Sequence, residues 1–519
     1  MDRTLKCSSF SVNGKDFEKN RMLFCFFWTI VFGLFAHSYR FFISAFSHDS
    51  LDAIFSDSIE YQWKIGLGRF FAPLVLKLRG NIALPWLVGI ASILFIAIAV
   101  WLVIKTLDIK SKATIILVSG IMVTNITVTA TAATYIHDLD FDMLALLFSC
   151  AAAYIMMKKQ KLGWYILSSA LIMLSLGLYQ SYIEVALMIV IIASVKNLLD
   201  GFGAKDVVKC GLKSIVSFAC GGVAYYALYK IICKFMGVTA QERTEFHVDE
   251  STSIIVNIKK MLYKVLSTFI NPVSALSSRV VGILNVILIA IGVILCLLLI
   301  FKLGRNKTAE KIVALSLLAS IPIAINIISI AVNGVVYELM IYSFWFMYIF
   351  SLLMTDKMKK SFEHNRFSKY VRIASIVIVG VIIWNNIVVA NMAYLRKDLE
   401  NTATVSAMTR VVDDLEERND YSVGKTEISF VGSVSTMKTM PGFEFFSDTT
   451  GLRGSCSISQ SGISDHYNLY KSFFNYYLNY PINYSSKDFS DNEKVKNMPT
   501  YPEKGYIQNI DGVLVVKMG

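Results

Sequence analysis

The amino-acid sequence predicts a polytopic α-helical membrane protein with about eleven transmembrane helices. Of its 519 residues, 55% are hydrophobic and only 17% are charged, and the mean hydropathy is +0.55. Average globular chains carry about 25% charged residues, so this chain lacks the charge that a soluble surface would need. Three runs without charge, 84–104, 280–301 and 373–392, are long enough to cross a bilayer as helices.

The basic residues indicate membrane topology rather than nucleic-acid binding. The net charge is +12, but Lys and Arg cluster in short connections such as KTLDIKSK (105–112), KKQK (158–161) and KLGRNK (302–307). This is the positive-inside pattern, which sets the orientation of membrane proteins. We therefore expect a multi-pass protein of the cell membrane whose cytoplasmic N-terminus is an uncleaved signal anchor. No nucleic-acid partner is expected.

Hydropathy and loop charge together locate the expected spans. They lie at about 22–46, 83–104, 113–134, 140–157, 162–180, 182–195, 214–236, 280–301, 312–332, 335–354 and 373–392. An odd number of spans places the C-terminus outside the cell. The span near 182–195 is short, so ten or twelve spans are also compatible with the sequence.

Two outer loops, 47–82 and 237–279, are long and each contains an amphipathic stretch. Such stretches predict helices that lie in the plane of the membrane. After about residue 396 a polar helix and two short strand patterns, EISFVGS and GVLVVKM, follow. We therefore expect a transmembrane domain over residues 1–395 and a small extracytoplasmic α+β domain over residues 396–519.

The segment TYIHDLDFDMLALLF (134–148) places His137, Asp138, Asp140 and Asp142 between two apolar runs. Asp138 could simply cap the next helix, where the helix dipole favours negative charge. One acid suffices for that role, however, and Asp142 lies one turn further into the apolar run. Ionisable residues at such positions indicate function.

A second acidic group follows the first span, in the segment HDSLD. Here Asp49 and Asp52 share a face if the segment is helical, and His48 precedes them. Either aspartate could instead cap the amphipathic helix.

Further polar candidates lie at the same expected membrane level. Gln180, Tyr182 and Glu184 surround an outer turn, and Glu184 could alternatively bond to a neighbouring helix. Lys64 and Arg69 interrupt the otherwise acidic outer face. Their side chains could extend to lipid headgroups or bind an anionic ligand such as a phosphate.

The stretch HDSLDAIFSDSIEYQWKIGLGRFF, with YIHDLDFDMLALL and LGLYQSYI, resembles the bacterial and phage type II O-antigen glucosyltransferase (Gtr) family, of the GT-C class. The resemblance covers roughly the first 200 residues and beyond them is one of topology only. It implies a GT-C-like bundle and an inverting transfer of a hexose, glucose in that family, from a polyprenyl-phosphate carrier. The acceptor would be a glycan on the outer face of the membrane, either an O-antigen repeat or a cell wall polysaccharide such as a teichoic acid.

The resemblance also implies roles for the candidates. Asp49 and Asp52 take the first-loop acid positions, and Arg69 takes the GR position. The resemblance does not choose between the two aspartates as the base; we favour Asp49 because it lies closer to the end of the first span. Asp138, Asp140 and Asp142 match the second acidic loop. We expect the two loops to meet at the mouth of one cavity that opens to lipid. Some relatives use a divalent cation, and clustered aspartates would permit Mg or Mn, but no cofactor is certain.

The competing hypothesis is a transporter or flippase of lipid-linked sugars. Transporters place their acids near the midplane of the bilayer, in broken helices of paired repeats. Here the acids gather at one interface, and the sequence contains no visible repeat. No GxxxxGK[ST], HExxH or GxSxG motif occurs, so nucleotide hydrolysis and zinc or serine hydrolase chemistry have no support.

Overall fold

The computed structural model describes residues 12–46, 51, 58–159, 161–239, 254–331, 336–361, 366–432, 468–485 and 487–518. The first acidic group, His48, Asp49 and Asp52, lies outside these ranges. The second acidic group and all the other expected site residues lie inside them.

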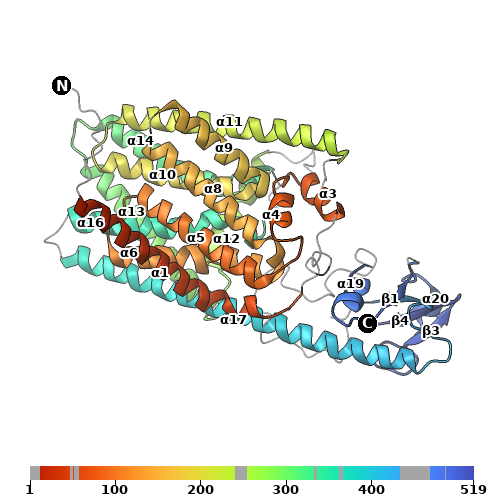
Figure 1. Cartoon of the computed structure of the whole chain (residues 1–519). Helices are drawn as coiled ribbons and strands as arrows, with labels where there is room; N and C mark the ends of the chain where they lie inside the picture. Colours follow the sequence, from red (N-terminus) through yellow and green to blue (C-terminus); the bar gives the residue numbers. More distant parts are fainter. Residues whose placement is uncertain are drawn as a thin grey trace.

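Long helices form a bundle, and α17 continues beyond it towards a small β-sheet (Figure 1). The helices of the bundle are α1 (Val12–Phe42), α5 (Pro85–Thr106), α6 (Lys112–Thr124), α7 (Ile126–Thr134), α8 (Leu139–Lys158), α9 (Leu162–Leu178), α10 (Ile183–Leu199), α11 (Ala204–Met236), α13 (Ser278–Lys302), α14 (Thr308–Ala324), α15 (Ile328–Ala331), α16 (Phe346–Ser361) and α17 (Arg366–Glu416). Short 3-10 turns join some of them: η1 (Ile136–Asp138), η2 (Gln180–Tyr182), η4 (Glu338–Met340) and η5 (Tyr342–Trp345).

Each of the expected spans overlaps one or more of these helices. Within the described residues, eight helices are long and apolar enough to cross a membrane. The helices α9, α14 and α16 are shorter, at 17, 17 and 16 residues. The helical character expected from the apolar runs is therefore present, and several long apolar helices agree with a membrane protein.

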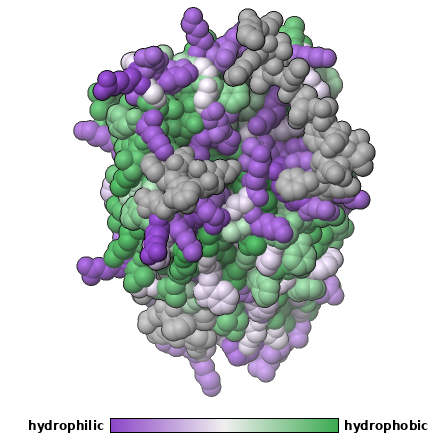
Figure 2. Space-filling view, turned by 90° about the vertical axis from the view of Figure 1, so that its left-hand side faces the viewer, coloured by the Kyte–Doolittle hydropathy of each residue, from purple (hydrophilic) through white to green (hydrophobic). Residues whose placement is uncertain are grey.

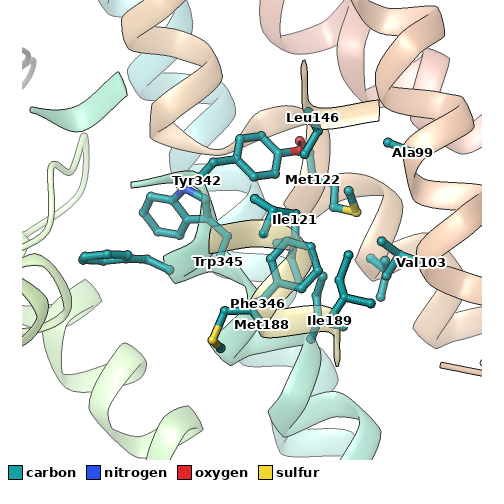
Figure 3. Close-up of a cluster of buried hydrophobic side chains, with 14 of the residues drawn as sticks. Ala99, Val103, Ile121, Met122, Leu146, Met188, Ile189, Tyr342, Trp345 and Phe346 are labelled. Atoms are coloured by element: carbon teal, nitrogen blue, oxygen red, sulfur yellow. Dashed lines mark hydrogen bonds between the residues drawn. The ribbon is translucent and has the colours of Figure 1, made fainter. Parts of the chain in front are cut away.

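The main hydrophobic core lies where five helices of the bundle meet. Figure 3 shows side chains that contribute to it, among them Val103 of α5, Met122 of α6, Leu146 of α8, Ile189 of α10 and Phe346 of α16. All five are buried. Because lipid tails are as apolar as these side chains, close packing rather than removal from water holds such helices together.

Three further helices lie within the two long loops that contain the amphipathic stretches. These are α3 (Ser58–Gly66), α4 (Ala72–Leu78) and α12 (Ile254–Ile270). On α12, Ile255, Leu262 and Tyr263 are exposed while Met261 is buried. α12 therefore has the two-sided character expected of a helix in the membrane plane.

The last quarter of the described chain forms a sheet with short helices. Its strands are β1 (Glu427–Val431), β2 (Asn483–Tyr484), β3 (Ile507–Ile510) and β4 (Val513–Lys517), and its helices are α19 (Asn468–Tyr476) and α20 (Glu493–Lys496). The strand order is β2-β1-β4-β3, with β3 and β4 antiparallel and the other pairs parallel. β1 and β4 correspond to the two strand patterns of the sequence. Residue 396, the expected domain boundary, lies inside the unbroken helix α17.

One end of the bundle carries the basic connections. α5, α8 and α13 have Lys105, Lys158 and Lys302 in their last turns. Cations are favoured there because the C-terminal end of a helix carries partial negative charge. Figure 2 shows this end, with hydrophilic residues across the face and hydrophobic residues along its flanks.

Candidate active site

Two of the expected cations lie where α3 leads into α4: Lys64 is in the last turn of α3, and Arg69 is in the turn that follows. The Arg69 amide donates to the Lys64 carbonyl at 2.9 Å, which closes the turn. Gly68 has a φ of +79°, which L side chains rarely adopt. A Cβ at Gly68 would also lie 2.3 Å from the hydroxyl oxygen of Tyr225. Glycine is therefore needed for this turn, which brings Lys64 and Arg69 to the same carboxylate.

That carboxylate belongs to Asp138, at the end of the 3-10 turn η1. Its Oδ2 forms an ion pair with Lys64 Nζ and lies 3.5 Å from Arg69 Nη1. Its Oδ1 lies 3.3 Å from His137 Nε2. Lys64 also pairs with Glu60 Oε1 at 3.2 Å. The side chain of Asp138 is 2% exposed, and buried charges are tolerated only when paired, so these contacts hold α3 against η1.

Asp140 is held by a different cation, Arg79, which follows α4. Arg79 Nη1 lies 2.9 Å from Asp140 Oδ1, and Arg79 Nη2 donates to the carbonyl oxygen of His137. α4 is thereby attached to the same acidic turn as α3. The three expected aspartates consequently do not converge on one point, because Asp138 and Asp140 face different cations.

Asp142 contributes a buried carboxylate oxygen that no described donor satisfies. The residue is 2% exposed, and its Oδ1 has no hydrogen-bond partner among the described residues. The same holds for the Tyr182 hydroxyl and for Arg69 Nε, and both residues interact electrostatically with Asp142. Unsatisfied buried polar atoms are rare in native proteins. These three atoms are therefore candidates to bind water or a ligand hydroxyl.

Arg69 is the least engaged of the cations. Its guanidinium carbon lies 4.3 Å from the centre of the Tyr179 ring, and its side chain is 17% exposed, against 5% for Lys64 and for Arg79. Burial acts to lower the pKa of Arg69, but surrounding acidic groups outweigh it, and the net pKa is raised. Arg69 thus remains a cation with donor capacity to spare.

Gln180 reaches the same turn from η2. Its Nε2 donates to the Leu67 carbonyl at 2.9 Å and to the Tyr225 hydroxyl at 3.1 Å. Tyr229, one turn further along α11, donates to the Gly66 carbonyl at 2.8 Å. The structure therefore brings Gln180 beside Arg69, where its amide braces the turn.

Glu184 lies fully buried in the first turn of α10, where its carboxylate has other partners. Its Oε1 accepts from the Ile328 amide at 2.7 Å, and its Oε2 accepts from the Ser343 hydroxyl at 3.3 Å. These bonds fasten α10 to α15 and η5. They correspond to the alternative in which Glu184 bonds to a neighbouring element, and its role in substrate binding stays a prediction.

Arg40 links the end of α1 to the segment that precedes the acidic turn. Its Nε donates to the Ala132 carbonyl at 2.8 Å, and its Nη2 donates to the Ala45 carbonyl at 3.0 Å. Ala45 stands four residues before Asp49, and Ala132 stands six residues before Asp138. The two acidic loops therefore leave the bundle from neighbouring points, although Asp49 itself is outside the described residues.

The chain just before Asp49 is also fixed from the side of the sheet. Asn401 of α17 accepts from the Phe46 amide at 3.0 Å and donates to the Phe46 carbonyl at 3.2 Å. The Phe46 ring lies 5.2 Å from Phe473 and 4.7 Å from Tyr477, between ring centres. The start of the first acidic loop is thus held between α17 and α19.

Replacing Asn401 by alanine should destabilise the protein by about 1–3 kcal/mol, because both buried backbone groups of Phe46 lose their partner. Denaturant unfolding in detergent, followed by tryptophan fluorescence, measures this change. The matched control is Thr402→Ala, at an exposed position where the hydroxyl bonds only within its own helix. Equal unfolding midpoints for the Asn401 and Thr402 variants would contradict the prediction.

The chain matches the model of a known family. The family model described as glucosyl transferase GtrII matches residues 38–356. The chain belongs to the GtrII family. The matched range runs from late α1 to α16 and contains all of the expected site residues. No curated protein and no solved structure matches the chain.

A divalent metal fits the described residues of this GtrII family member poorly. Glu60, His137 and Asp138 offer ligand atoms within 4.8 Å of one another. The Lys64 ammonium, however, contacts both Glu60 and Asp138. Mg and Mn prefer oxygen ligands without a competing cation. The cluster is therefore neutralised by an ammonium, and no metal is needed to account for it.

Sequence reasoning did not select two charged residues of the candidate site, Glu60 and Arg79. Glu60 resembles an ordinary solvated charge of the amphipathic helix, although its i,i+4 spacing from Lys64 is the sequence signal for their ion pair. Arg79 has only a faint signal, since it and Lys77 are the two cations in the largely apolar stretch after Arg69. Its partner Asp140 is 61 residues away, and only the fold pairs them.

Proposed function

We propose that this GtrII protein transfers glucose from a polyprenyl-phosphate carrier to a cell-surface glycan, with inversion at the anomeric carbon. The observation that carries the proposal is Arg69, a cation only loosely paired with Asp138, beside the unsatisfied carboxylate oxygen of Asp142. A cation can bind the phosphate of an anionic lipid donor, and a carboxylate can take the proton of the acceptor hydroxyl. Membership of a glucosyl transferase family supports the sugar.

Arg69 is the cation best suited to the donor phosphate. Lys64 and Arg79 already compensate Asp138 and Asp140, while Arg69 keeps a looser contact of 3.5 Å with Asp138. Arginine presents a fork of donors that matches phosphate geometry. As the bond between the anomeric carbon and the phosphate oxygen breaks, this guanidinium would stabilise the charge that develops on the leaving phosphate.

The acceptor hydroxyl would attack from the opposite side of the sugar. A carboxylate takes its proton as the new bond to the anomeric carbon forms. Asp49 is the favoured base and Asp52 the alternative, and the Arg40 contacts support their proximity to the second loop. Asp142 and Tyr182, with their unsatisfied oxygens, would bind sugar hydroxyls.

The proposed site would lie at the outer face of the cell membrane, with the N-terminus in the cytoplasm. The basic ends of α5, α8 and α13 lie at the end of the bundle opposite the acidic turn. Basic connections stay cytoplasmic by the positive-inside rule. The acidic turn, and the sheet at the end of α17, would then be extracytoplasmic.

Arg69→Met should lower kcat/KM for the lipid donor about 10²–10³-fold, since a donor to the developing phosphate charge is lost. Arg69→Lys should recover part of this loss, because it keeps the charge but not the fork. Transfer of radiolabelled glucose at varied polyprenyl-phosphate glucose concentrations measures both. Arg279→Met, at an exposed arginine at the start of α13, is the control. Unchanged donor kinetics in Arg69→Met would remove the phosphate role.

A reconstituted assay tests the function as a whole. Purified protein in liposomes is given polyprenyl-phosphate sugars and glycan acceptors in a panel, and both glycan labelling and movement of the donor across the bilayer are recorded. We expect labelling of at least one acceptor with glucose as the best donor. Donor translocation without any transfer would instead identify a transporter.

A further inference from the structure

A polar cavity lies beside α12, and its lining includes none of the three aspartates. Its volume is about 140 Å³, and its lining comes mainly from α12, α13, α17 and the turns η4 and η5. A water molecule takes roughly 30 Å³, so the space exceeds that of a single bound water. Neither the ion pairs of Asp138 nor those of Asp140 extend into it. The cavity therefore requires an explanation of its own.

Amide side chains dominate the polar lining: Asn271, Asn285, Asn385 and Asn386 all contribute to the wall. Asn385 is 1% exposed. Its Oδ1 accepts from the Ser274 hydroxyl at 2.8 Å, but its Nδ2 has no hydrogen-bond partner among the described residues. A buried amide donor without an acceptor is costly. This atom indicates that the cavity holds a ligand or solvent that accepts a hydrogen bond.

The aromatic wall of the cavity is fixed by its own hydrogen bonds. The Tyr348 hydroxyl donates to Asn285 Oδ1 at 2.8 Å, and Asn285 Nδ2 donates to the Phe269 carbonyl at 3.1 Å. Trp345 Nε1 donates to the Thr127 hydroxyl at 3.1 Å. Trp345 and Tyr348 are therefore held in place before any ligand arrives, which reduces the entropy cost of binding.

The charges at the cavity are balanced, unlike those at Arg69. Lys264 and Glu338 face each other with 3.4 Å between Nζ and Oε1, and both line the space. A phosphate would find no uncompensated cation among the lining residues. A neutral ligand with several hydroxyls suits a wall of amides and rigid aromatic rings, since such pockets orient ligands by a few convergent polar groups.

We propose that this cavity binds one neutral sugar unit of the glycan acceptor. The assignment to the acceptor rests on the proposed transferase function. The η5 turn connects the two places: Trp345 lines the cavity, while the ring of Tyr342 lies 5.6 Å from that of Tyr182, between centres. The cavity and Tyr182 therefore both contact the η5 turn. A sugar unit held there would anchor the acceptor next to the proposed donor site.

Binding can be measured without catalysis. Full-length protein in lipid nanodiscs is titrated with methyl glucoside, methyl galactoside, methyl mannoside and methyl rhamnoside, and saturation-transfer NMR reports binding. We expect at least one glycoside to bind the wild type and Asn386→Leu to weaken it about tenfold, the equivalent of one or two lost hydrogen bonds. Thr268→Val, which removes a hydroxyl from the lining, should also weaken binding.

The control is Asn391→Leu, the same substitution on α17 at a residue that does not line the cavity. It should bind the glycoside as the wild type does. If no glycoside binds the wild type, or if Asn386→Leu and Thr268→Val both bind as the wild type, the cavity does not hold a sugar. Water alone would then fill it.

Kinetics separate this proposal from the transferase function. Asn386→Leu should raise KM for the acceptor about tenfold while KM for the lipid donor stays unchanged. If transfer proceeds normally in this variant, the cavity proposal fails alone. If glycosides bind but no donor supports transfer, the transferase proposal fails, and the saccharide site remains with a different purpose.

Discussion

Asp49→Asn is expected to slow glucose transfer about 10²–10⁴-fold, because asparagine keeps the shape of the side chain but cannot accept a proton. Ala45, four residues earlier, is bonded to Arg40, which also holds Ala132 near the acidic turn. These contacts support a position of the first acidic loop near the second, which is where the proposed base would have to act. Single-turnover transfer from polyprenyl-phosphate glucose, with the donor saturating, measures the chemical step.

Asp52→Asn is the matched control for Asp49, with the same substitution three residues later. We expect a smaller loss in kcat, since only one carboxylate takes the proton. The opposite ranking would exchange the two roles. If neither substitution slows transfer while Asp142→Asn abolishes it, the base belongs to the second acidic loop, where Asp142 Oδ1 has no described partner.

Lys64→Met should destabilise the protein by about 3–5 kcal/mol, the usual cost of leaving a buried charge without its partner. Lys64 is 5% exposed and pairs with both Glu60 and Asp138. Methionine fills similar volume, so the lost charge rather than a cavity would cause the effect. Unfolding in detergent, followed by circular dichroism over a denaturant series, gives the free energy.

A double-mutant cycle distinguishes this charge effect from general disruption. Asp138→Asn in the Lys64→Met background should restore part of the stability, because the uncompensated carboxylate is removed. Lys494→Met, at an exposed residue 4.0 Å from Asp511, should leave stability unchanged. A Lys64→Met protein as stable as the wild type would show that Arg69 and His137 suffice to compensate Asp138.

The sequence predicted the helical bundle well because apolar runs and basic connections are local signals. Runs such as 84–104 fix the length of a helix whatever packs beside it. Local signals do not reveal that α17 continues past residue 396, because the polar sequence of its C-terminal half predicts a separate helix. The break between α6 and α7 at Asn125 is also hidden, because Asn125 lies inside an apolar segment and caps α7 by accepting from the Val128 amide.

The sequence could indicate which polar residues gather at the candidate site but not which of them pair. Asp138, Arg69 and Gln180 stand at expected outer connections, and the fold brings them together. Which cation faces which carboxylate depends on how α3 and α4 pack against η1. Glu184 shows the limit most clearly: its position in an apolar run gives the same signal whether it binds substrate or bonds to the Ile328 amide.

The continuous helix α17 fixes a distance as well as a position. Its 51 residues correspond to about 77 Å at 1.5 Å per residue, whereas the hydrocarbon core of a bilayer is only about 30 Å thick. A continuous helix is stiffer than a flexible linker. It therefore fixes both the distance of the sheet from the bundle and the rotation of the sheet about the helix axis. One added residue within α17 would turn the tip by about 100° and move Asn401 out of phase with Phe46. The number of residues between the last apolar run and the sheet is therefore constrained, as the register of two paired strands is.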